Sequence, residues 1–483
     1  MAAMAILVSA SAAAAAPGDA GLKTNCAAYD DYALRAQRGT VLEYANGKLD
    51  KAATEQVEQI RSRLRALSPA NIVVHLHGGL VDRCQGYGTA VRLGPLYRTA
   101  GVFPIFPIYH VGFWESLHYG RAGFTAYPVE DPRSAAVIPR IIRINRETQQ
   151  RVQLGRDHAG EGTTRREERL RYAAFVNGGL WTGGRVWAYM KRVVDESMHT
   201  DSADVGPFPT LGPAAREDDP AGLTIMRVLE ERIAENPQTR ITLVGHSTGA
   251  IWITKFLRAW YREHRTDKKR FSVIFIAPAV RYDDFARLLP REPRAGESVE
   301  SAAIDLVANF RTFAMRDEYE INVNEIGTFF AKNIYAPSLL YGVSSIFEDH
   351  PDTPILGMQR FQCRDGLEGH LTLQDYSPDD NRPNAAQAAR DSAVVHRVDS
   401  VLHDLFATPF AYSPALGARV PETFRTGSVT HGGFPDDPAT IQSVTALSAS
   451  RQSWPALDKN QWRTIEDCGV DPMTLLDPDD PVR

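Results

Sequence analysis

The chain has 483 residues, of which 43% are hydrophobic and 23% are charged, and its formal net charge is -5. This composition is typical of a globular protein with a sizeable core, and it differs from that of disordered or membrane-embedded chains. Nucleic acid is not an expected partner, because the sequence contains no long basic run that could neutralise phosphate groups.

Residues 1–16 form an Ala-rich apolar segment with Ile6, Leu7 and Val8 at its centre. The segment resembles a secretory signal peptide, which predicts export to the periplasm or the extracellular space. No basic residue precedes Lys23, so the alternative is a disordered leader on a cytoplasmic protein. No other stretch reaches the ~20 apolar residues that a membrane-spanning helix needs, so we expect no transmembrane segment.

The sequence contains four scattered cysteines that lack the spacing of metal ligands: Cys26, Cys84, Cys363 and Cys468. In an exported protein this even number could form two disulfides, and the sequence does not select the pairing. Without export, we expect four separate thiols.

The first strong elements of the predicted core lie between residues 51 and 109. Polar and apolar spacing predicts a helix over Lys51–Leu67, and a β-branched run predicts a buried strand that begins at Asn71. A further strand is predicted over Gly101–Tyr109. Pro104 and Pro107 each remove a backbone donor, which favours a place at the sheet edge or an irregular course for this strand.

The composition changes between residues 109 and 218, where Arg- and Glu-rich, Gly-Trp and Pro-rich segments follow one another. We expect this region to be an insertion that forms a cap or lid over the core. One amphipathic helix is predicted within it, and that helix could face a substrate cleft or pack within the insertion. Its apolar residues are Leu180, Trp181, Val186, Trp187, Met190, Val193 and Val194.

After the insertion, Asp219-Pro220 predicts the start of a helix that stops near Asn236-Pro237. Apolar runs predict strands before Gly245, over Arg270–Ala279 and over Ala308–Met315. Strands that alternate with helices at this spacing indicate an α/β fold with a mainly parallel sheet flanked by helices.

The strand from Ile241 breaks abruptly into Gly245-His246-Ser247-Thr248-Gly249, and a helical pattern follows. In a Gly-x-Ser-x-Gly motif a sharp strand-to-helix turn holds the serine side chain out, and the flanking positions must be small. Ser247 is therefore the candidate nucleophile. His246 is adjacent to it, so its side chain should diverge and pack under the turn or line the pocket.

These motifs and their order resemble those of the α/β-hydrolase fold, over roughly residues 71–447. In that family a His-Gly-Gly-type loop after an early strand and the residue after the nucleophile donate backbone N–H groups to the oxyanion. The resemblance implies Gly79 and Thr248 as the two donors, with Gly78 as the alternative to Gly79. Leu80 stands where many esterases have a third glycine.

The resemblance also implies an acid and a histidine, in that order, after the serine. Asp317 follows a predicted strand and is the candidate acid, although it could instead form a surface pair with Arg316. The alternatives are Glu318, beside it, and Asp283 or Asp284 after the preceding strand.

His431 is the candidate base, because it lies in a Gly-rich loop directly before a helix that Asp437-Pro438 begins. The main alternative is His370, which follows a possible strand over 355–362. His350 lies in a polar loop, whereas His396 and His403 belong to one predicted helix.

A metal site is a further alternative, because His75 and His77 are two apart on a strand and share a face, with Asp82 nearby. No other histidine-containing cluster completes such a site, so we expect neither a metal nor another cofactor.

The predicted organisation is a leader over residues 1–22, a core over 23–108 and 219–450, the inserted cap over 109–218, and a tail over 451–483. The resemblance implies a serine hydrolase that cleaves an ester bond through an acyl-enzyme intermediate. A small-molecule or lipid-like acyl substrate is expected, and Trp181, Trp187 and Tyr189 favour an apolar or aromatic group. An amidase, peptidase or lactonase with the same machinery is one alternative, and a non-catalytic binding protein is another.

Overall fold

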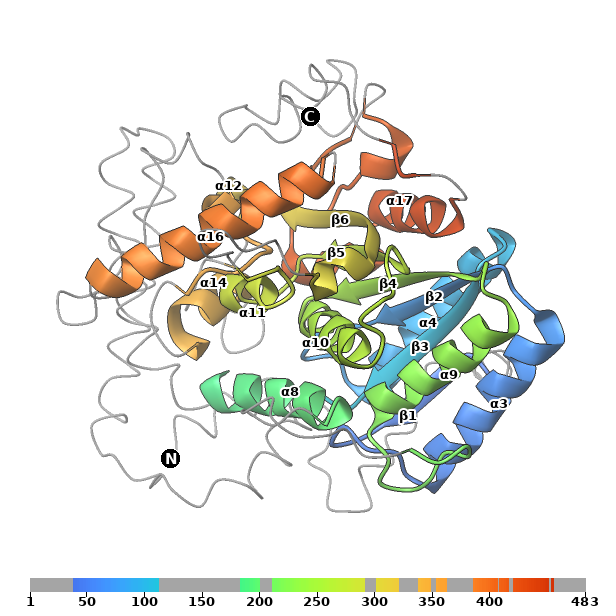
Figure 1. Ribbon diagram of the computed structural model, residues 1–483. Coiled ribbons are helices and arrows are strands. Elements are labelled where there is room, and N and C mark those ends of the chain that lie inside the picture. Colours follow the sequence, from blue (N-terminus) through green and yellow to red (C-terminus); the bar gives the residue numbers. More distant parts are fainter. Residues whose placement is uncertain are drawn as a thin grey trace, which may run out of the picture.

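The computed structural model describes residues 38–112, 183–199, 211–291, 301–320, 338–348, 353–362, 385–406, 408–416, 420–450 and 453–455. Within these residues the chain has an α/β fold, with a parallel seven-stranded sheet flanked by helices (Figure 1). The predicted α/β class and mainly parallel sheet are confirmed. The predicted leader, most of the predicted insertion and nearly all of the predicted tail lie outside the described residues.

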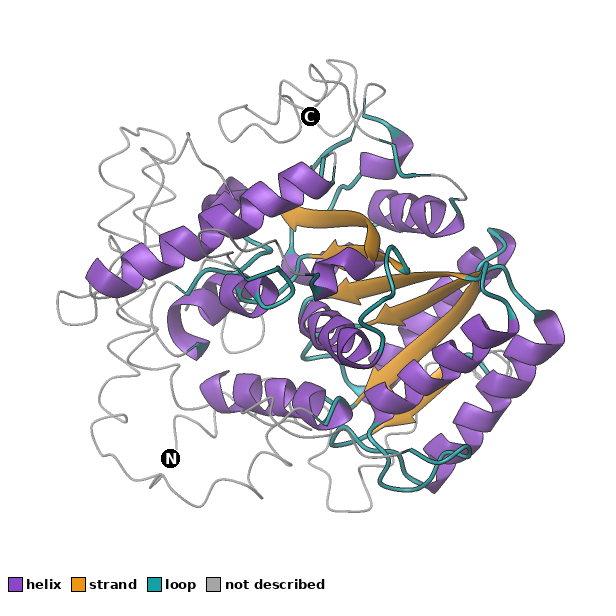
Figure 2. Ribbon diagram, viewed as in Figure 1, coloured by secondary structure: helices purple, strands orange, loops and turns teal. Residues whose placement is uncertain are grey.

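All neighbouring strands of the sheet run parallel, and Figure 2 shows them side by side with helices around them. In order across the sheet they are β1 (Val41–Tyr44), β3 (Phe103–Tyr109), β2 (Asn71–Leu76), β4 (Arg240–His246), β5 (Phe271–Ile276), β6 (Val307–Met315) and β7 (Phe410–Ser413). The carboxyl ends of parallel strands meet at one edge, so the loops after β2, β4, β6 and β7 converge there.

Helices cover both faces of the sheet and form two separate apolar cores. Residues of α4 (Arg83–Thr99) and α17 (Pro438–Ala449) pack in one core, and those of α3 (Lys51–Leu67), α9 (Ala221–Glu235) and α10 (Thr248–Glu263) pack in the other. Side chains of β4 alternate between them, since Leu243 belongs to one core and Val244 to the other. A strand that is buried on both faces needs a continuous apolar run, which the sequence of β4 supplies.

The described chain contains further helices outside these two groups. They are the long helix α16 (Ala385–Leu405), the short helices α11 (Tyr282–Ala286), α12 (Asp317–Glu320), α14 (Leu339–Gly342) and α15 (Gln359–Gln362), the 3-10 helices η1 (Ala303–Leu306), η5 (Glu422–Phe424) and η6 (His431–Asp436), and the π-helix η2 (Val343–Phe347). Among the described residues, no helix combines the length and apolar character needed to cross a bilayer.

The expectation that β3 lies at the sheet edge or has an irregular course is wrong, because β3 is a continuous strand that pairs with both β1 and β2. Backbone donors of alternate residues in a strand point to opposite neighbours. The donor that Pro104 lacks would point toward β1, which pairs with β3 only from Phe106 onward. The donor that Pro107 lacks would point toward β2, whose pairing with β3 ends at Ile105. Neither proline therefore removes a ladder hydrogen bond.

The possible strand over 355–362 is also wrong. Ile355 makes an isolated antiparallel bridge to Arg281, and Gln359–Gln362 form α15. The strand that follows β6 across the sheet is instead β7, which the sequence did not indicate. His431 follows β7 along the chain, whereas His370 lies outside the described residues.

The described part of the predicted insertion contains α8 (Gly183–Ser197). Its apolar residues from Val186 to Val194 are buried in the same core as α9 and α10. An ion pair between Lys255 of α10 and Asp195 adds a polar connection at this interface. The described part of α8 thus packs as part of the core.

Candidate functional site

Ser247 lies at the sharp turn between β4 and α10 and has a φ of 52° and a ψ of -114°. Positive φ is unfavourable for a residue with a Cβ, so the surrounding structure must hold it. The Ser247 N–H donates to the carbonyl of Ile276 at 2.9 Å, and its carbonyl accepts from the N–H groups of Ala250 and Ala279 at 3.1 Å. These bonds fix the turn between β5 and the first turn of α10.

The glycines that flank Ser247 are required by close backbone contacts. A Cβ on Gly245 would lie 2.6 Å from the carbonyl carbon of Gly249, and a Cβ on Gly249 would lie 2.9 Å from the Cβ of Leu76. Since side-chain atoms do not approach this closely, both positions need glycine. The prediction that small residues flank Ser247 is therefore explained by the packing of β2 and α10 at the turn.

The loop after β2 lies directly against this turn. A Cβ on Gly78 would be 3.1 Å from the Cβ of Ser247, and a Cβ on Gly79 would be 3.1 Å from Cγ2 of Thr248. The structure thus brings together the two segments that carry the candidate nucleophile and the predicted oxyanion donors. Leu80 then turns the chain with a φ of 60°, a conformation that glycine adopts more readily.

Two hydrogen bonds orient the peptide groups of this loop. The Tyr109 hydroxyl donates to the carbonyl of His77, and Nδ1 of His77 donates to the carbonyl of Gly78 at 2.7 Å. The tautomer follows from Nε2 of His77, which accepts the N–H of Tyr109 at 3.2 Å. Burial lowers the pKa of His77 to about 4, although its bond to Gly78 opposes this shift, so the ring is neutral near pH 7.

These two bonds determine where the N–H groups of the loop point. In a trans peptide the C=O and N–H groups point in opposite directions, so the N–H groups of Gly78 and Gly79 face away from Tyr109 and His77. Neither N–H, nor that of Thr248, has a backbone acceptor among the described residues. These three backbone N–H groups belong to the two segments that pack together at the Ser247 turn.

His431 follows β7 and begins η6, where only 3% of its surface is exposed. Neither of its ring nitrogens has a hydrogen-bond partner in the described part of the chain. Its ring centroid lies 5.1 Å from that of His246, the residue before Ser247. Burial lowers the pKa of His431 to about 4, and a neutral imidazole with an available nitrogen can accept a proton.

Asp317 begins α12, two residues beyond the end of β6, and its backbone is therefore at the same sheet edge as Ser247. The side chains of Asp317 and Glu318 lie outside the described residues. Arg316, which precedes Asp317, is only 3% exposed.

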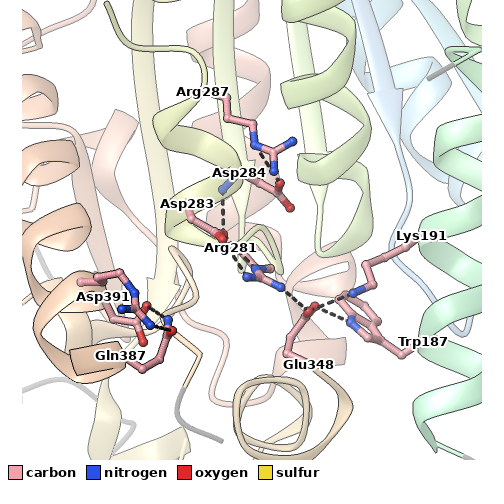
Figure 3. Close-up of polar contacts among 10 residues, drawn as sticks. Trp187, Lys191, Arg281, Asp283, Asp284, Arg287, Glu348, Gln387 and Asp391 are labelled. Atoms are coloured by element: carbon pink, nitrogen blue, oxygen red, sulfur yellow. Dashed lines mark hydrogen bonds and ion pairs between the residues drawn. The ribbon is translucent and has the colours of Figure 1, made fainter. Parts of the chain in front are cut away.

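The alternative acids at the end of β5 already have cationic partners, as Figure 3 shows. Two nitrogens of Arg281 bind the two carboxylate oxygens of Asp283 at 2.8 and 2.7 Å. Asp284 lies 3.7 Å from Arg287 in an ion pair. These contacts favour structural roles for both aspartates.

The residues of the alternative metal site form hydrogen bonds with other groups of the protein. Nδ1 of His75 lies 2.8 Å from the Tyr97 hydroxyl, and both ring nitrogens of His77 are hydrogen-bonded as described above. Asp82 caps α4 by accepting from the N–H of Gln85 at 2.8 Å. The hydrogen bonds of His75, His77 and Asp82 therefore give each of these residues a structural role.

Helix α8 forms one wall beside the predicted donors. A Cβ on Gly79 would lie 2.6 Å from Sδ of Met190, so this thioether covers the loop. The helix is anchored by Glu348, whose carboxylate accepts from the indole N–H of Trp187 at 2.6 Å and pairs with Lys191 at 2.9 Å and Arg281 at 3.1 Å (Figure 3). The Glu348 side chain is fully buried, so these three partners compensate its charge.

Cys84, near the start of α4, is disulfide-bonded. It is the one cysteine among the described residues, so its partner lies outside them. The predicted use of cysteines in disulfides is confirmed for this residue.

Sequence reasoning missed the roles of Tyr109, His246 and Glu348 at the site. Tyr109 ends a strand that looked like an edge, and Glu348 lies far from every motif in the sequence. His246 was expected to pack under the turn or to line the pocket, and nothing in the sequence indicated that it contacts His431. Trp181, His350 and His370 lie outside the described residues, and His396 and His403 both belong to α16.

Neither protein-family models, nor curated proteins, nor solved structures give a match to this chain. The function is therefore inferred from the residues and geometry of the site.

Proposed function

We propose that the protein is an α/β-hydrolase-like serine hydrolase that cleaves an ester bond through an acyl-enzyme intermediate. The observation that carries the proposal is the strained turn at Ser247, with the unpaired N–H groups of Gly79 and Thr248 beside it. A turn that only connects a strand to a helix does not need a serine with positive φ. Such backbone strain is concentrated at functional sites, which supports a role for Ser247 in function.

In the proposed reaction, His431 removes the proton from the Ser247 hydroxyl as the oxygen attacks the ester carbonyl carbon. The C=O π electrons move to the carbonyl oxygen, and the Gly79 and Thr248 N–H groups donate to the resulting oxyanion. The oxyanion electrons then re-form the C=O bond, the bond to the alcohol oxygen breaks, and His431 gives its proton to that oxygen, which leaves an acyl group on Ser247. His431 next removes a proton from water as the water oxygen attacks the acyl carbon. When the second oxyanion collapses, the bond to Ser247 Oγ breaks, His431 returns the proton to Oγ, and the carboxylic acid leaves.

Asp317 is the proposed acid of this triad. Because burial disfavours a charged imidazole, the imidazolium that forms on His431 needs a nearby negative charge. Asp317 follows the strand next to β7, which supports its selection over the two aspartates that are paired with arginines.

The wall beside the donors supports an apolar acyl group in the substrate. Met190 contributes a flexible thioether that would lie 2.6 Å from a Cβ on Gly79, so the group next to the proposed donors is apolar. We propose that α8 and the rest of the insertion act as the cap of the site. An amide or lactone would use the same groups, so the leaving group must be determined by assay.

Export is the proposed localisation, and the disulfide at Cys84 supports it, because disulfides persist in oxidising compartments. Alkylation of the purified native chain without reductant tests the bond. No modification of Cys84 is expected before reduction, and rapid modification would argue against the disulfide.

Hydrolysis of p-nitrophenyl esters tests the proposed activity. The parent protein is expected to hydrolyse butyrate and octanoate esters faster than the acetate ester, and faster than the matching anilides. Ser247→Ala should lower kcat by at least about 1,000-fold, whereas Ser301→Ala, at an exposed serine, should leave it unchanged. Equal rates for Ser247→Ala and the parent would exclude the proposal.

A further inference from the structure

The imidazole of His246 lies between the loop after β2 and the loop that carries His431. On one side, a Cβ on Gly78 would be 2.7 Å from Nδ1 of His246. On the other side, Nε2 of His246 lies 3.0 Å from the carbonyl oxygen of His431. The ring thus fills the space between the predicted oxyanion loop and the candidate base, and it is only 5% exposed.

The chemistry of this contact fixes the tautomer of His246. A carbonyl oxygen can only accept, so Nε2 must carry the proton that it donates. Nδ1 then carries the lone pair, and it has no partner among the described residues. Burial lowers the pKa of His246 to about 3, and the nearby His431 ring contributes to this shift, so the imidazole stays neutral at ordinary pH.

The chain before His431 is held by hydrogen bonds of its own, in which the Ser413 hydroxyl donates to the carbonyl of Ser428 and the Gly427 N–H donates to Asp437 at 2.7 Å. His431 itself is bound differently, because its carbonyl accepts from His246, whereas its ring nitrogens have no partner among the described residues. This bond joins residues that are 185 positions apart. It connects the candidate base directly to the residue before the candidate nucleophile.

We infer that His246 is a positioning residue, whose Nε2–H group holds the His431 carbonyl and so sets the distance from the His431 ring to Ser247. This inference rests on the proposed function. A general base must come within about 2.6–3.2 Å of the hydroxyl that it deprotonates. Because Ser247 is rigidly connected to His246 through the strained turn, the hydrogen bond transfers that rigidity to the His431 loop.

A purely structural role makes a different prediction. If His246 only fills space, then an apolar residue of similar size should support catalysis as well as any other folded variant. If its donor positions His431, then a side chain that keeps a donor at the same reach should retain activity. Gln places its amide nitrogen at a reach similar to that of Nε2, whereas Leu offers no donor.

The experiment compares His246→Gln, His246→Leu and the control His75→Leu. His75 is a buried histidine of β2 whose Nδ1 bonds the Tyr97 hydroxyl at 2.8 Å, rather than the His431 carbonyl. We expect His246→Leu to lower kcat for p-nitrophenyl butyrate by about 10- to 100-fold, with KM within about twofold. His246→Gln should recover most of kcat, and His75→Leu should keep it. Thermal unfolding of each variant reports whether it is folded. Equal kcat for the Gln and Leu variants would overturn the inference.

A second measurement does not depend on activity. Imidazole 15N NMR of the parent should show His246 as the neutral Nε2–H tautomer from pH 5 to 8, with a scalar coupling across the hydrogen bond to the His431 carbonyl carbon. An Nδ1–H tautomer or a charged ring would overturn the inference even in an active enzyme. If the parent is inactive while the coupling is present, then the proposed function fails and the hydrogen bond stands.

Discussion

The hydroxyl of Tyr109 lies 3.3 Å from Oγ1 of Thr248, and it thereby connects the end of β3 to the first residue of α10. Tyr109 donates its single proton to the carbonyl of His77, so Thr248 must be the donor in this contact. The chain of bonds therefore runs from one predicted oxyanion segment to the other. It connects the loop after β2 to the N-terminus of α10, the two segments that carry the proposed oxyanion donors.

Tyr109→Phe should lower kcat for ester hydrolysis by about 10-fold, because a lost hydrogen bond of about 1.4 kcal/mol changes a rate tenfold. KM should change little, since the bond acts on the transition state. Tyr97→Phe is the matched control, because the Tyr97 hydroxyl bonds His75 rather than the loop. Steady-state kinetics of both variants check the prediction, and equal losses would contradict it.

Gly79→Ala should lower kcat by about 100-fold, because the new methyl group would overlap Sδ of Met190 and press on Thr248, which would displace a donor by a fraction of an ångström or more. Met190→Ala in the same chain should restore part of the activity by removing the nearer contact. A double-mutant cycle in kcat measures this coupling. Strictly additive losses would show that Met190 does not lie over the loop.

The buried histidines make stability depend on pH. The pKa values of His75 and His246 are lowered to about 3 by burial, so the folded state keeps these rings neutral while the unfolded state binds protons below about pH 6.5. The free energy of unfolding should therefore fall as the pH decreases from about 6.5 toward about 3, by up to about 1.4 kcal/mol per pH unit for each ring.

His75→Gln removes one of these groups and should reduce that slope by about 1.4 kcal/mol per pH unit between pH 6 and pH 5. Urea unfolding at pH 7.5, 6 and 5 measures the slope. Glu43, whose pKa is lowered to about 2 because bonds from His110 and Arg83 outweigh the effect of burial, loses its stabilising effect only below about pH 4.5. An unchanged slope in the variant would mean that His75 is not neutral in the folded protein.

Glu348→Gln should reduce the free energy of unfolding by about 3 kcal/mol, because it leaves Lys191 and Arg281 without their buried counter-charge. Asp283→Asn is the matched control, since it also removes a carboxylate from Arg281 but at a side chain that is 45% exposed. The control substitution should reduce the free energy of unfolding by less than about 1 kcal/mol. Urea unfolding of the Glu348→Gln and Asp283→Asn variants measures this difference. The kcat of the Glu348→Gln variant should also fall, because Glu348 anchors α8 and α8 carries Met190.

Much of the fold could be predicted from local pattern. The observed bounds of α3 are the predicted ones, α9 begins directly after Pro220, and α17 begins at Pro438, because periodic apolar spacing and capping are local signals. The course of β3 could not be predicted, since the effect of its prolines depends on where the neighbouring strands end. β7 has only four residues, which is too short for a clear pattern.

The candidate site divides in the same way. Ser247, Gly79 and Thr248 could be placed together because each belongs to a short motif with a steric reason. The contact of His246 with His431 and the bond of Tyr109 to His77 join distant segments, so only the folded chain reveals them. Local motifs thus predicted which candidate residues lie together, whereas the contacts that join distant segments required the structure.

Covalent labelling by a fluorophosphonate tests the central claim most directly. The parent protein should gain the mass of one phosphonyl group, and peptide mapping should place it on Ser247. Labelling should be absent in Ser247→Ala, slower in His431→Ala and unchanged in Ser301→Ala. A parent protein that is not labelled, or a label that persists in Ser247→Ala, would contradict the assignment of Ser247 as the nucleophile.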